Sequence, residues 1–282
     1  MSEVGTVYLA RAANGREPFR KFLSSYSRFA AGLPNQLILV FKGFRGQADT
    51  VEFEAEAAAF QPQTLHLADF GYDIRAYSQA VRNFDYEFFC CFNSFSEILD
   101  EGWLRKMFTH ASQPGVGLVG ATGSGESMYS NALAEWRAGE GAVLPRRLPL
   151  WIRLQLCRLG FDPFPNYHVR TNAFLMSRSL FLQTWPRRVL TKRGAYLFEN
   201  GKRSLTQRIR AQGLKVLVVG RDGAAYEPGN WEQSNTFRRG DQANLLVADN
   251  QTRQFAAADA PTKARLAAAA WSGSGVASEE HS

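Results

Sequence analysis

The chain has 282 residues, 45% of them hydrophobic, and a formal net charge of +7. A chain of this length and apolar content can bury a substantial core, which excludes wholesale disorder. No stretch approaches the roughly 20 apolar residues that span a bilayer, and the N-terminus lacks the basic and apolar segments of a signal peptide, so we expect a cytoplasmic protein.

Short apolar runs alternate with amphipathic segments through the first half of the chain. Residues 6–10 predict a strand, and Pro18 opens a helical pattern of aromatic and leucine residues. The alternation continues with predicted strands at 37–41, 64–68 and 116–119 and predicted helices at 49–60, 74–83 and 103–110. Strands separated by helices favour an α/β fold with a mostly parallel sheet flanked by helices.

The segment 85–97 differs from the others because an aromatic run passes abruptly into small polar residues. Residues 86–92 predict the central strand, covered on both faces. Two of the three cysteines lie in this run. The odd number of cysteines in the chain and the expected burial of this pair favour reduced structural thiols. Ligands gather where such strands end, so Asn93, Ser94 and Ser96 would lie at the mouth of a cleft. The alternative is that Asn93 and Ser94 only form a turn and a helix cap.

After Gly120 the alternation loosens. Residues 120–127 almost match the phosphate-binding loop, but Glu126 stands where that loop requires a lysine, so we expect a flexible loop and no ATPase or GTPase. Further strands are predicted at 169–176 and 215–219, a helix at 205–211 capped by Ser204, an Ala-rich helix at 256–270 and a disordered polar tail at 272–282.

Basic residues crowd the stretch 146–221, in which the acids are Asp162 and Glu199. Such a region attracts nucleotide phosphates, an acidic membrane surface or nucleic acid. We expect no nucleic-acid partner, because helix-turn-helix, zinc-finger and RNA-recognition signatures are missing from the sequence. Residues 148–161 form a basic amphipathic pattern that suits either an anionic inner-membrane surface or an ordinary packed surface helix.

Six stretches, in this order and spacing, are similar to those of a known enzyme family. They are YLARAANG (8–15), DFGYDIRAY (69–77), FNSFSE (92–97), GLVGATGS (117–124), HVRTNAF (168–174) and FENGK (198–202). Over residues 7–255 the chain resembles a GT-A type glycosyltransferase, of the family-2-like enzymes that build bacterial surface polysaccharides such as lipopolysaccharide. The resemblance implies a GT-A-like, Rossmann-like domain over residues 1–255 and a C-terminal extension over 256–282.

The resemblance further implies a nucleotide-sugar donor bound across the carboxyl ends of the first strands and a saccharide or lipid-linked acceptor. The donor-side residues would be Arg11, Asp69, Asp73, Asn93 and Ser94. Arg11 would face the nucleotide, and the two aspartates would accept hydrogen bonds from base or ribose. The alternatives are a solvated Arg11 and a helix-capping Asp73.

On the acceptor side the resemblance points to polar residues of two later stretches. They are Gly120, Ser124, Arg170, Thr171 and Asn172. The polar segment 231–255 would fold over the donor as a lid that excludes water. The competing interpretation of that segment is an ordinary surface loop.

The chain departs from the family at the metal site. The family usually carries Asp-x-Asp after the central strand to hold Mg or Mn, but the corresponding residues here are Asn93, Ser94 and Phe95. We therefore assign no metal ligand: the metal is dispensable, Asp241 or Asp249 contributes, or transfer has been lost. In a metal-free reaction, preorganised cations or N–H donors can offset the charge that develops on the leaving diphosphate. The candidates are Arg170, Lys202, Arg203, Arg238, Arg239 and Arg253.

Glu199 is the candidate catalytic residue, because it is nearly the only acid in a long basic stretch and is expected in a loop before a helix. In an inverting transfer one carboxylate removes the proton of the acceptor hydroxyl, and Glu199 would be this general base. The alternative is a salt bridge to Lys202 or Arg203. The rival function is a non-catalytic module of the same fold that binds a nucleotide sugar or a glycan.

Overall fold

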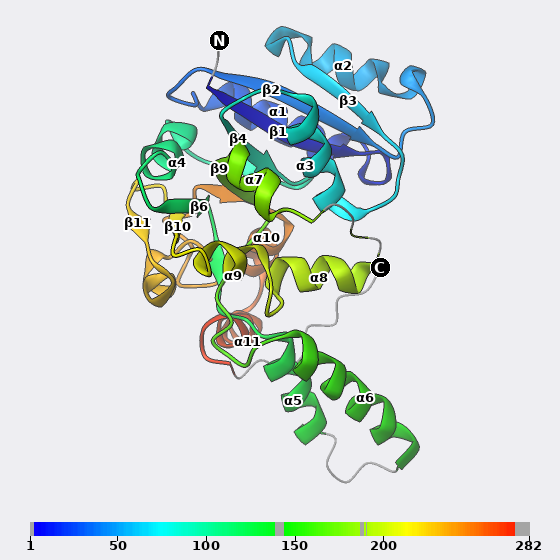
Figure 1. Cartoon of the computed structure of the whole chain (residues 1–282), viewed down its shortest axis with the longest axis vertical. Coiled ribbons are helices and arrows are strands. Elements are labelled where there is room, and N and C mark those ends of the chain that lie inside the picture. Colours follow the sequence, from blue (N-terminus) through cyan, green and yellow to red (C-terminus); the bar gives the residue numbers. More distant parts are fainter. Residues whose placement is uncertain (1–2, 139–143, 187–188, 190, 274–282) are drawn as a thin grey trace.

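The computed structural model describes residues 3–138, 144–186, 189 and 191–273. Its centre is an eight-stranded sheet in the order β11-β10-β6-β9-β4-β1-β2-β3 (Figure 1). The strands are β1 (Val4–Arg11), β2 (Asn35–Lys42), β3 (Gln63–Leu67), β4 (Phe88–Phe92), β6 (Val116–Gly120), β9 (Ala173–Ser177), β10 (Lys215–Val219) and β11 (Ala225–Tyr226).

Most neighbours in this sheet run parallel. β1 pairs parallel with β2 and with β4, β2 with β3, and β6 with β10. β9 runs antiparallel between β4 and β6, and β11 is an antiparallel edge strand. The predicted α/β class with a mostly parallel sheet is therefore confirmed.

Helices cover both faces of the sheet, as the continuous apolar run of the central strand predicted. In β4 the side chains of Cys90 and Phe92 join one core cluster, and those of Phe89 and Cys91 join the other. One face packs against α1 (Arg16–Arg28), α2 (Val51–Ala57) and α4 (Trp103–Ala111). The opposite face packs against α3 (Tyr72–Asn83), α7 (Arg178–Thr184), α8 (Lys192–Asn200) and α9 (Leu205–Arg210).

The segment predicted as one strand at 169–176 is divided. Residues His168–Val169 form β8, which pairs with the short strand β7 (Gly123–Ser124), whereas β9 pairs with β4 and β6. The chain changes partners at residues 170–172, so these three residues form a turn. The pairing of β7 also means that residues 121–125 are buried, unlike the flexible loop that we expected.

Two further parts complete the chain. A helical hairpin of α5 (Met128–Ala138) and α6 (Leu144–Gly160) projects from the sheet layers (Figure 1). The predicted Ala-rich helix is instead two helices, α10 (Asn250–Ala257) and α11 (Ala260–Trp271), because Asp259 caps a new helix by accepting from the backbone N–H of Thr262. The predicted tail lies outside the described residues from 274 onward. None of the described helices is long and apolar enough to cross a bilayer.

Candidate active site

A cavity of about 400 Å³ opens at the carboxyl end of β4. Asn93, which follows β4, forms one part of its wall, and the turn 170–172 forms another. Glu199 of α8 and residues of the segment 237–251 complete the enclosure. Segments far apart in the sequence therefore meet at one sheet edge, where α/β proteins bind ligands.

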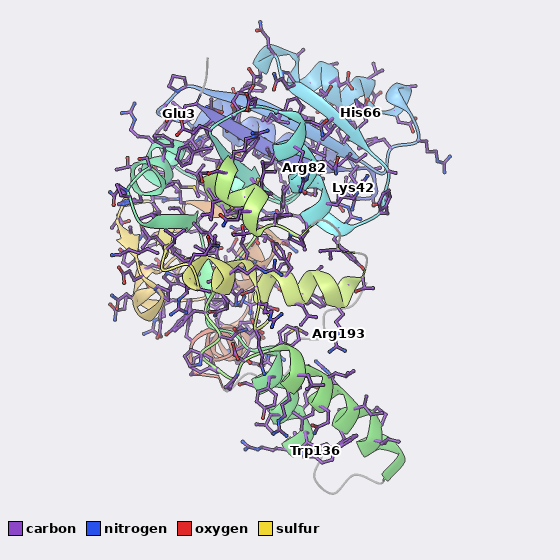
Figure 2. All side chains as sticks on the ribbon, in the orientation of Figure 1. Glu3, Lys42, His66, Arg82, Trp136 and Arg193 are labelled. Carbon is purple, nitrogen blue, oxygen red and sulfur yellow. The ribbon has the colours of Figure 1, made fainter. Side chains whose placement is uncertain are left out.

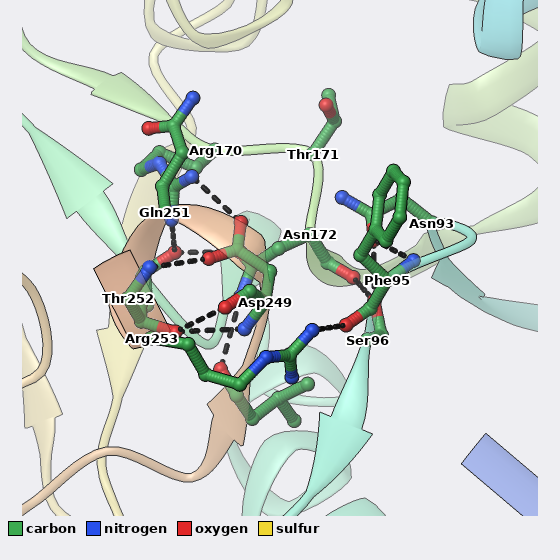
Figure 3. A network of polar contacts seen from close by, with 12 residues as sticks. Asn93, Phe95, Ser96, Arg170, Thr171, Asn172, Asp249, Gln251, Thr252 and Arg253 are labelled. Carbon is green, nitrogen blue, oxygen red and sulfur yellow. Dashed lines mark hydrogen bonds and ion pairs between the residues drawn. The ribbon is translucent and has the colours of Figure 1, made fainter. Parts of the chain in front are cut away.

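Hydrogen bonds hold the turn 170–172 in place (Figure 3). The amide of Asn172 donates to the carbonyl of Val247 at 3.0 Å, and its side-chain oxygen accepts from the Thr122 hydroxyl at 2.6 Å. The backbone N–H of Asn93 donates to the Asn172 carbonyl at 3.2 Å. Asn172 is therefore a buried residue that positions the turn. The side chain of the neighbouring Thr171 points away from this network (Figure 3).

Arg170 and Asp249 form an ion pair at 2.7 Å in the cavity wall (Figure 3). Asp249 also caps α10, because its side chain accepts from the backbone N–H of Thr252 at 2.9 Å. Burial would raise the pKa of Asp249, but Arg170 and Thr252 outweigh it and hold that pKa below its usual value. The Arg170 guanidinium also lies 4.1 Å from the ring centroid of Phe237, so it is fixed from two sides.

Glu199 lies in the last turn of α8 rather than in the expected loop. Burial and the negative charge of Asp73 raise its pKa to about 7, although the Thr171 hydroxyl, which donates to Glu199 Oε1 at 3.2 Å, and Arg170 act in the opposite direction. The expected alternative partner Lys202 instead donates to the carbonyl of Arg158. Glu199 is thus a carboxyl group that exchanges its proton near neutral pH while facing a cavity.

Four charged side chains gather at the carboxyl ends of the first three strands. The Asp69 carboxylate lies 3.5 Å from both Arg11 and Lys42, and Lys42 is only 2% exposed. Burial, reinforced by Arg11, lowers the pKa of Lys42, whereas burial raises the pKa of Asp73 against the attraction of the two cations. We call these four residues the donor-side group. The group does not line the cavity, but the charge of Asp73 acts on Glu199.

Asp73 does not act as the cap of its helix. The residue at the N-cap of α3 is Gly71, at φ +72°, and Asp73 belongs to the first helical turn. A glycine adopts this left-handed conformation without strain. The capping interpretation of Asp73 is therefore wrong, and the charges of Arg11 and Lys42 act on its carboxylate instead.

Asn93, Ser94 and Phe95, the residues that we compared with Asp-x-Asp, do not suit Mg or Mn. The Asn93 side-chain oxygen accepts from the backbone N–H of Phe95 and from the Ser96 hydroxyl, and the buried Ser94 hydroxyl donates to the Leu9 carbonyl at 2.7 Å. Asp249, considered as a substitute ligand, is committed to Arg170. Among the described residues no three His, Cys, Asp or Glu side chains cluster as a metal site. We therefore derive no step through a metal.

Of the acceptor-side residues, Ser124 lines the cavity and Gly120 does not. Gly120 is instead a packing position, where a Cβ would lie 2.4 Å from Val169. Glu126 follows Ser124 on the cavity wall and forms an ion pair at 3.3 Å with Arg238. In the sequence, Glu126 stood out only as a mismatch with the phosphate-binding loop. In the structure it is the ion-pair partner of Arg238.

The structure brings part of the predicted site together. The cavity is lined by Asn93, Ser124, Arg170, Thr171, Asn172 and Glu199, and away from it lie Arg11, Asp69, Asp73, Ser94 and Gly120. Sequence reasoning missed Lys42, His168 and Asn200. Lys42 ends an apolar strand directly before a glycine, and this position could have marked it as a residue at the carboxyl edge of the sheet. His168 belongs to β8, and burial lowers its pKa. His168 and Asn200 lie in the family-like stretches 168–174 and 198–202, which were a signal for both.

The segment 231–255, expected as a lid, is packed into the protein. Trp231 and Phe237 are buried, and the Asn244 amide donates to the Ser234 carbonyl at 2.9 Å. Residues Val247–Ala248 form β12, which pairs with β5 (Glu97–Ile98) next to Asn93. The segment therefore forms a fixed wall of the cavity.

No protein-family model matches this sequence, and no curated protein matches it either. Among solved structures, the chain is similar to the mannosyltransferase PcManGT from Pyrobaculum calidifontis, solved with GDP-Man and Mn²⁺. The identity is 10% and the TM-score 0.48, over 83% of this chain and 60% of the mannosyltransferase.

Two other solved structures are similar to a comparable or lesser degree. The 4-diphosphocytidyl-2C-methyl-D-erythritol synthase from Anaerococcus prevotii is 12% identical, with a TM-score of 0.45 over 77% of this chain and 88% of that one. Glucosyl-3-phosphoglycerate synthase from Mycobacterium tuberculosis is 15% identical, with a TM-score of 0.39 over 63% and 56%. Because all three TM-scores lie below 0.5, the residues of this chain have to support any function by themselves.

Proposed function

We propose that this chain is a glycosyltransferase that moves a sugar from a nucleotide-sugar donor to a hydroxyl group of a saccharide or lipid-linked acceptor in surface polysaccharide biosynthesis. The observation that supports it best is Glu199, a carboxyl group with a pKa of about 7 on the wall of a cavity at the carboxyl edge of the sheet. A general base works best when its pKa lies near the operating pH.

The polar groups of the cavity suit a sugar. The side-chain oxygens of Asn131 and Asn200 are buried in the cavity wall without a hydrogen-bond partner in the described part of the chain. Thr171 and Ser124 add hydroxyl groups to the same wall. Buried polar atoms of this kind are usually satisfied, and sugar hydroxyls, which donate and accept, would satisfy them.

In the proposed reaction the acceptor hydroxyl oxygen forms a bond to the anomeric carbon, and the bond from that carbon to the nucleoside diphosphate breaks. The acceptor proton passes to the Glu199 carboxylate. The displacement inverts the anomeric carbon. Because the Thr171 hydroxyl already donates to Oε1 of Glu199, the other carboxylate oxygen is the one that would receive the proton.

The leaving diphosphate gains negative charge that preorganised cations can stabilise. On the donor side, Arg11 and Lys42 lie at the ends of β1 and β2, where a nucleotide would cross the strands. On the cavity side, Arg170 and Arg238 are already paired with Asp249 and Glu126. Arg11 and Lys42 share the single half-exposed carboxylate of Asp69 at 3.5 Å, whereas Arg170 and Arg238 each have an acid of their own. We therefore assign the nucleotide and its diphosphate to the donor-side group.

A second function, a binding module without catalysis, is favoured by one observation. The side chains of Asn93 and Ser94, which the family resemblance would align with two metal-binding carboxylates, are engaged in internal hydrogen bonds. Such a protein would keep the donor-side group and lack turnover. The two functions therefore differ in turnover, which only the transferase would show.

The test compares the wild type with Glu199→Gln. Thermal-shift screening against nucleotide sugars, with and without Mn²⁺ and EDTA, identifies the donor, since a ligand of the native state raises stability. Turnover is then measured with that donor. We expect Glu199→Gln to retain donor binding and to lose turnover by roughly 10²- to 10⁴-fold. Glu87→Gln, which changes an exposed carboxyl group, is the matched control.

A wild type that binds nucleotide sugars and turns none over would favour the binding module. Failure of every nucleotide sugar to bind would refute both functions. Turnover by Glu199→Gln at the wild-type rate would leave transfer standing but would remove Glu199 as the base.

A further inference from the structure

The outer face of α6 exposes a row of large apolar side chains. Their exposed fractions range from 41% to 74%, which is high for residues of this size. Four of them follow one another at spacings of three or four residues, and the fifth, Trp151, lies three residues after the first, so they lie on one side of the helix. The residues are Leu148, Trp151, Ile152, Leu156 and Leu159. We call this surface the α6 outer face.

Packing within the hairpin does not account for this face. α6 already buries an inner face, formed by Leu154 and Cys157, against Ala132 of α5 and against Phe161, which follows α6. The outer face points the other way, and the hairpin projects from the sheet layers (Figure 1). A helix with two apolar sides needs a second partner, because contiguous exposed apolar surface on this scale marks an interaction site.

Cations lie beside the C-terminal half of the α6 outer face. Arg158 is exposed on the helix itself. The exposed Arg193 donates to the carbonyl of Leu156 at 3.2 Å and lies between α8 and the hairpin (Figure 2). The Lys202 ammonium donates to the carbonyl of Arg158 at 3.0 Å. Arg193 and Lys202 are thus held beside the apolar row from a second element of the fold.

Acids are scarce in this region. Between residues 144 and 203 the sequence contains only Asp162 and Glu199, and Glu199 faces the cavity. On α6, Arg153 forms an ion pair with Glu135 on the α5 side, away from the outer face. An apolar centre with a basic rim complements a surface that is apolar inside and negatively charged at its edge.

We propose that the α6 outer face docks on an anionic lipid bilayer. The apolar row would enter the boundary between headgroups and acyl chains, and Arg158, Arg193 and Lys202 would meet the lipid phosphates. Since no described helix can cross a bilayer, the helix lies in the plane of the surface. Trp151 fits such a position, because its ring is apolar and its indole N–H can stay at the wet interface.

Docking through α6 would bring the cavity to the membrane. Arg153, from the same helix, lines the cavity, as do Met128 and Asn131 of α5. The hairpin is therefore at once the exposed apolar surface and one wall of the candidate active site. A lipid-linked acceptor would reach the cavity without leaving the bilayer surface, but the docking itself does not depend on transferase activity.

The experiment is flotation of the full chain with vesicles, which uses no substrate. Vesicles of phosphatidylcholine alone are compared with vesicles that also contain one quarter phosphatidylglycerol, at low and at high salt. We expect binding to the anionic vesicles that weakens as salt screens the charges. The double variant Trp151→Glu and Leu159→Glu should reduce binding by at least about tenfold, because it places charge in the apolar row.

Two matched variants separate the contribution of the cations to vesicle binding from that of the apolar row. Arg193→Glu should weaken binding to anionic vesicles and leave the low binding to neutral vesicles unchanged. Val51→Glu changes an equally exposed apolar residue on α2, 59% exposed, and should bind like the wild type. Far-UV circular dichroism verifies that each variant is folded.

Failure of the wild type to float with anionic vesicles would overturn the proposal. So would sedimentation showing that the wild type forms a dimer that the double variant abolishes, since a second copy would then cover the face. Loss of vesicle binding leaves the test of Glu199 untouched, so failure here is distinguishable from failure of the proposed function.

Discussion

Replacing Glu199 by glutamine should make the protein more stable at neutral and alkaline pH. In the folded chain, burial and the charge of Asp73 disfavour the ionised form of Glu199 and raise its pKa to about 7 from an ordinary value of 4.5. The folded state therefore binds this proton more tightly than the unfolded state. The free energy of unfolding accordingly falls as pH rises from 4.5 through 7.

The size of the effect follows from the two pKa values. A difference of one unit between the folded and unfolded pKa values corresponds to about 1.4 kcal/mol. Ionising Glu199 therefore costs about 3 kcal/mol more in the folded protein than in the unfolded chain. Because the side chain is partly open to the cavity, screening reduces the measurable effect to roughly 2–3 kcal/mol. Glutamine carries no proton to lose, so the variant lacks this dependence.

The assay is urea denaturation of wild type and Glu199→Gln at several pH values between 4.5 and 8.5. We expect the advantage of the variant to grow by roughly 2–3 kcal/mol between the two ends. Glu87→Gln serves as the control, and its difference from the wild type should stay nearly constant. Parallel profiles for wild type and Glu199→Gln would refute the reasoning, because they would show that Glu199 ionises as an ordinary surface carboxylate does.

Three further substitutions test the surroundings of this group. Asp73→Asn should lower the pH at which Glu199 titrates, seen as an acid-shifted stability profile; an unchanged midpoint would contradict the coupling. Arg170→Ala should destabilise the fold by about 3–5 kcal/mol in urea denaturation, because it leaves Asp249 buried without its partner; a loss below about 1 kcal/mol would show that the pair is dispensable. Lys42→Met should weaken nucleotide-sugar binding in calorimetry, and equal affinity would remove Lys42 from the donor side.

The sheet could be predicted because its signals are local. Continuous apolar runs such as β4 predict strands buried on both faces, and the abrupt change at Asn93 marked the edge at which the cavity opens. Arg11 ends β1, and Asp69 and Asp73 follow β3, which lies two places away in the sheet. Because these strands are parallel, the meeting of the three charges at one edge also follows from the alternation of strands and helices.

Other features depend on contacts that no local pattern records. The pairing of Arg170 with Asp249 joins residues 79 positions apart. The break at 170–172 depends on where β7 finds its partner. Glu199 was expected in a loop before a helix, but the helix α8 extends to Asn200. Gly194 lowers the helix propensity of this segment, and burial of Ala195 and Phe198 against the sheet overrides that preference.

The most direct test of Glu199 as the base is the pH dependence of kcat/KM with the identified donor and acceptor. If its carboxylate takes the acceptor proton, kcat/KM rises with pH and levels off above an apparent pKa of about 7. Glu199→Gln should lack both the rise and most of the rate. A wild-type profile that is flat between pH 5 and 8, or a glutamine variant with the wild-type profile, would contradict this role.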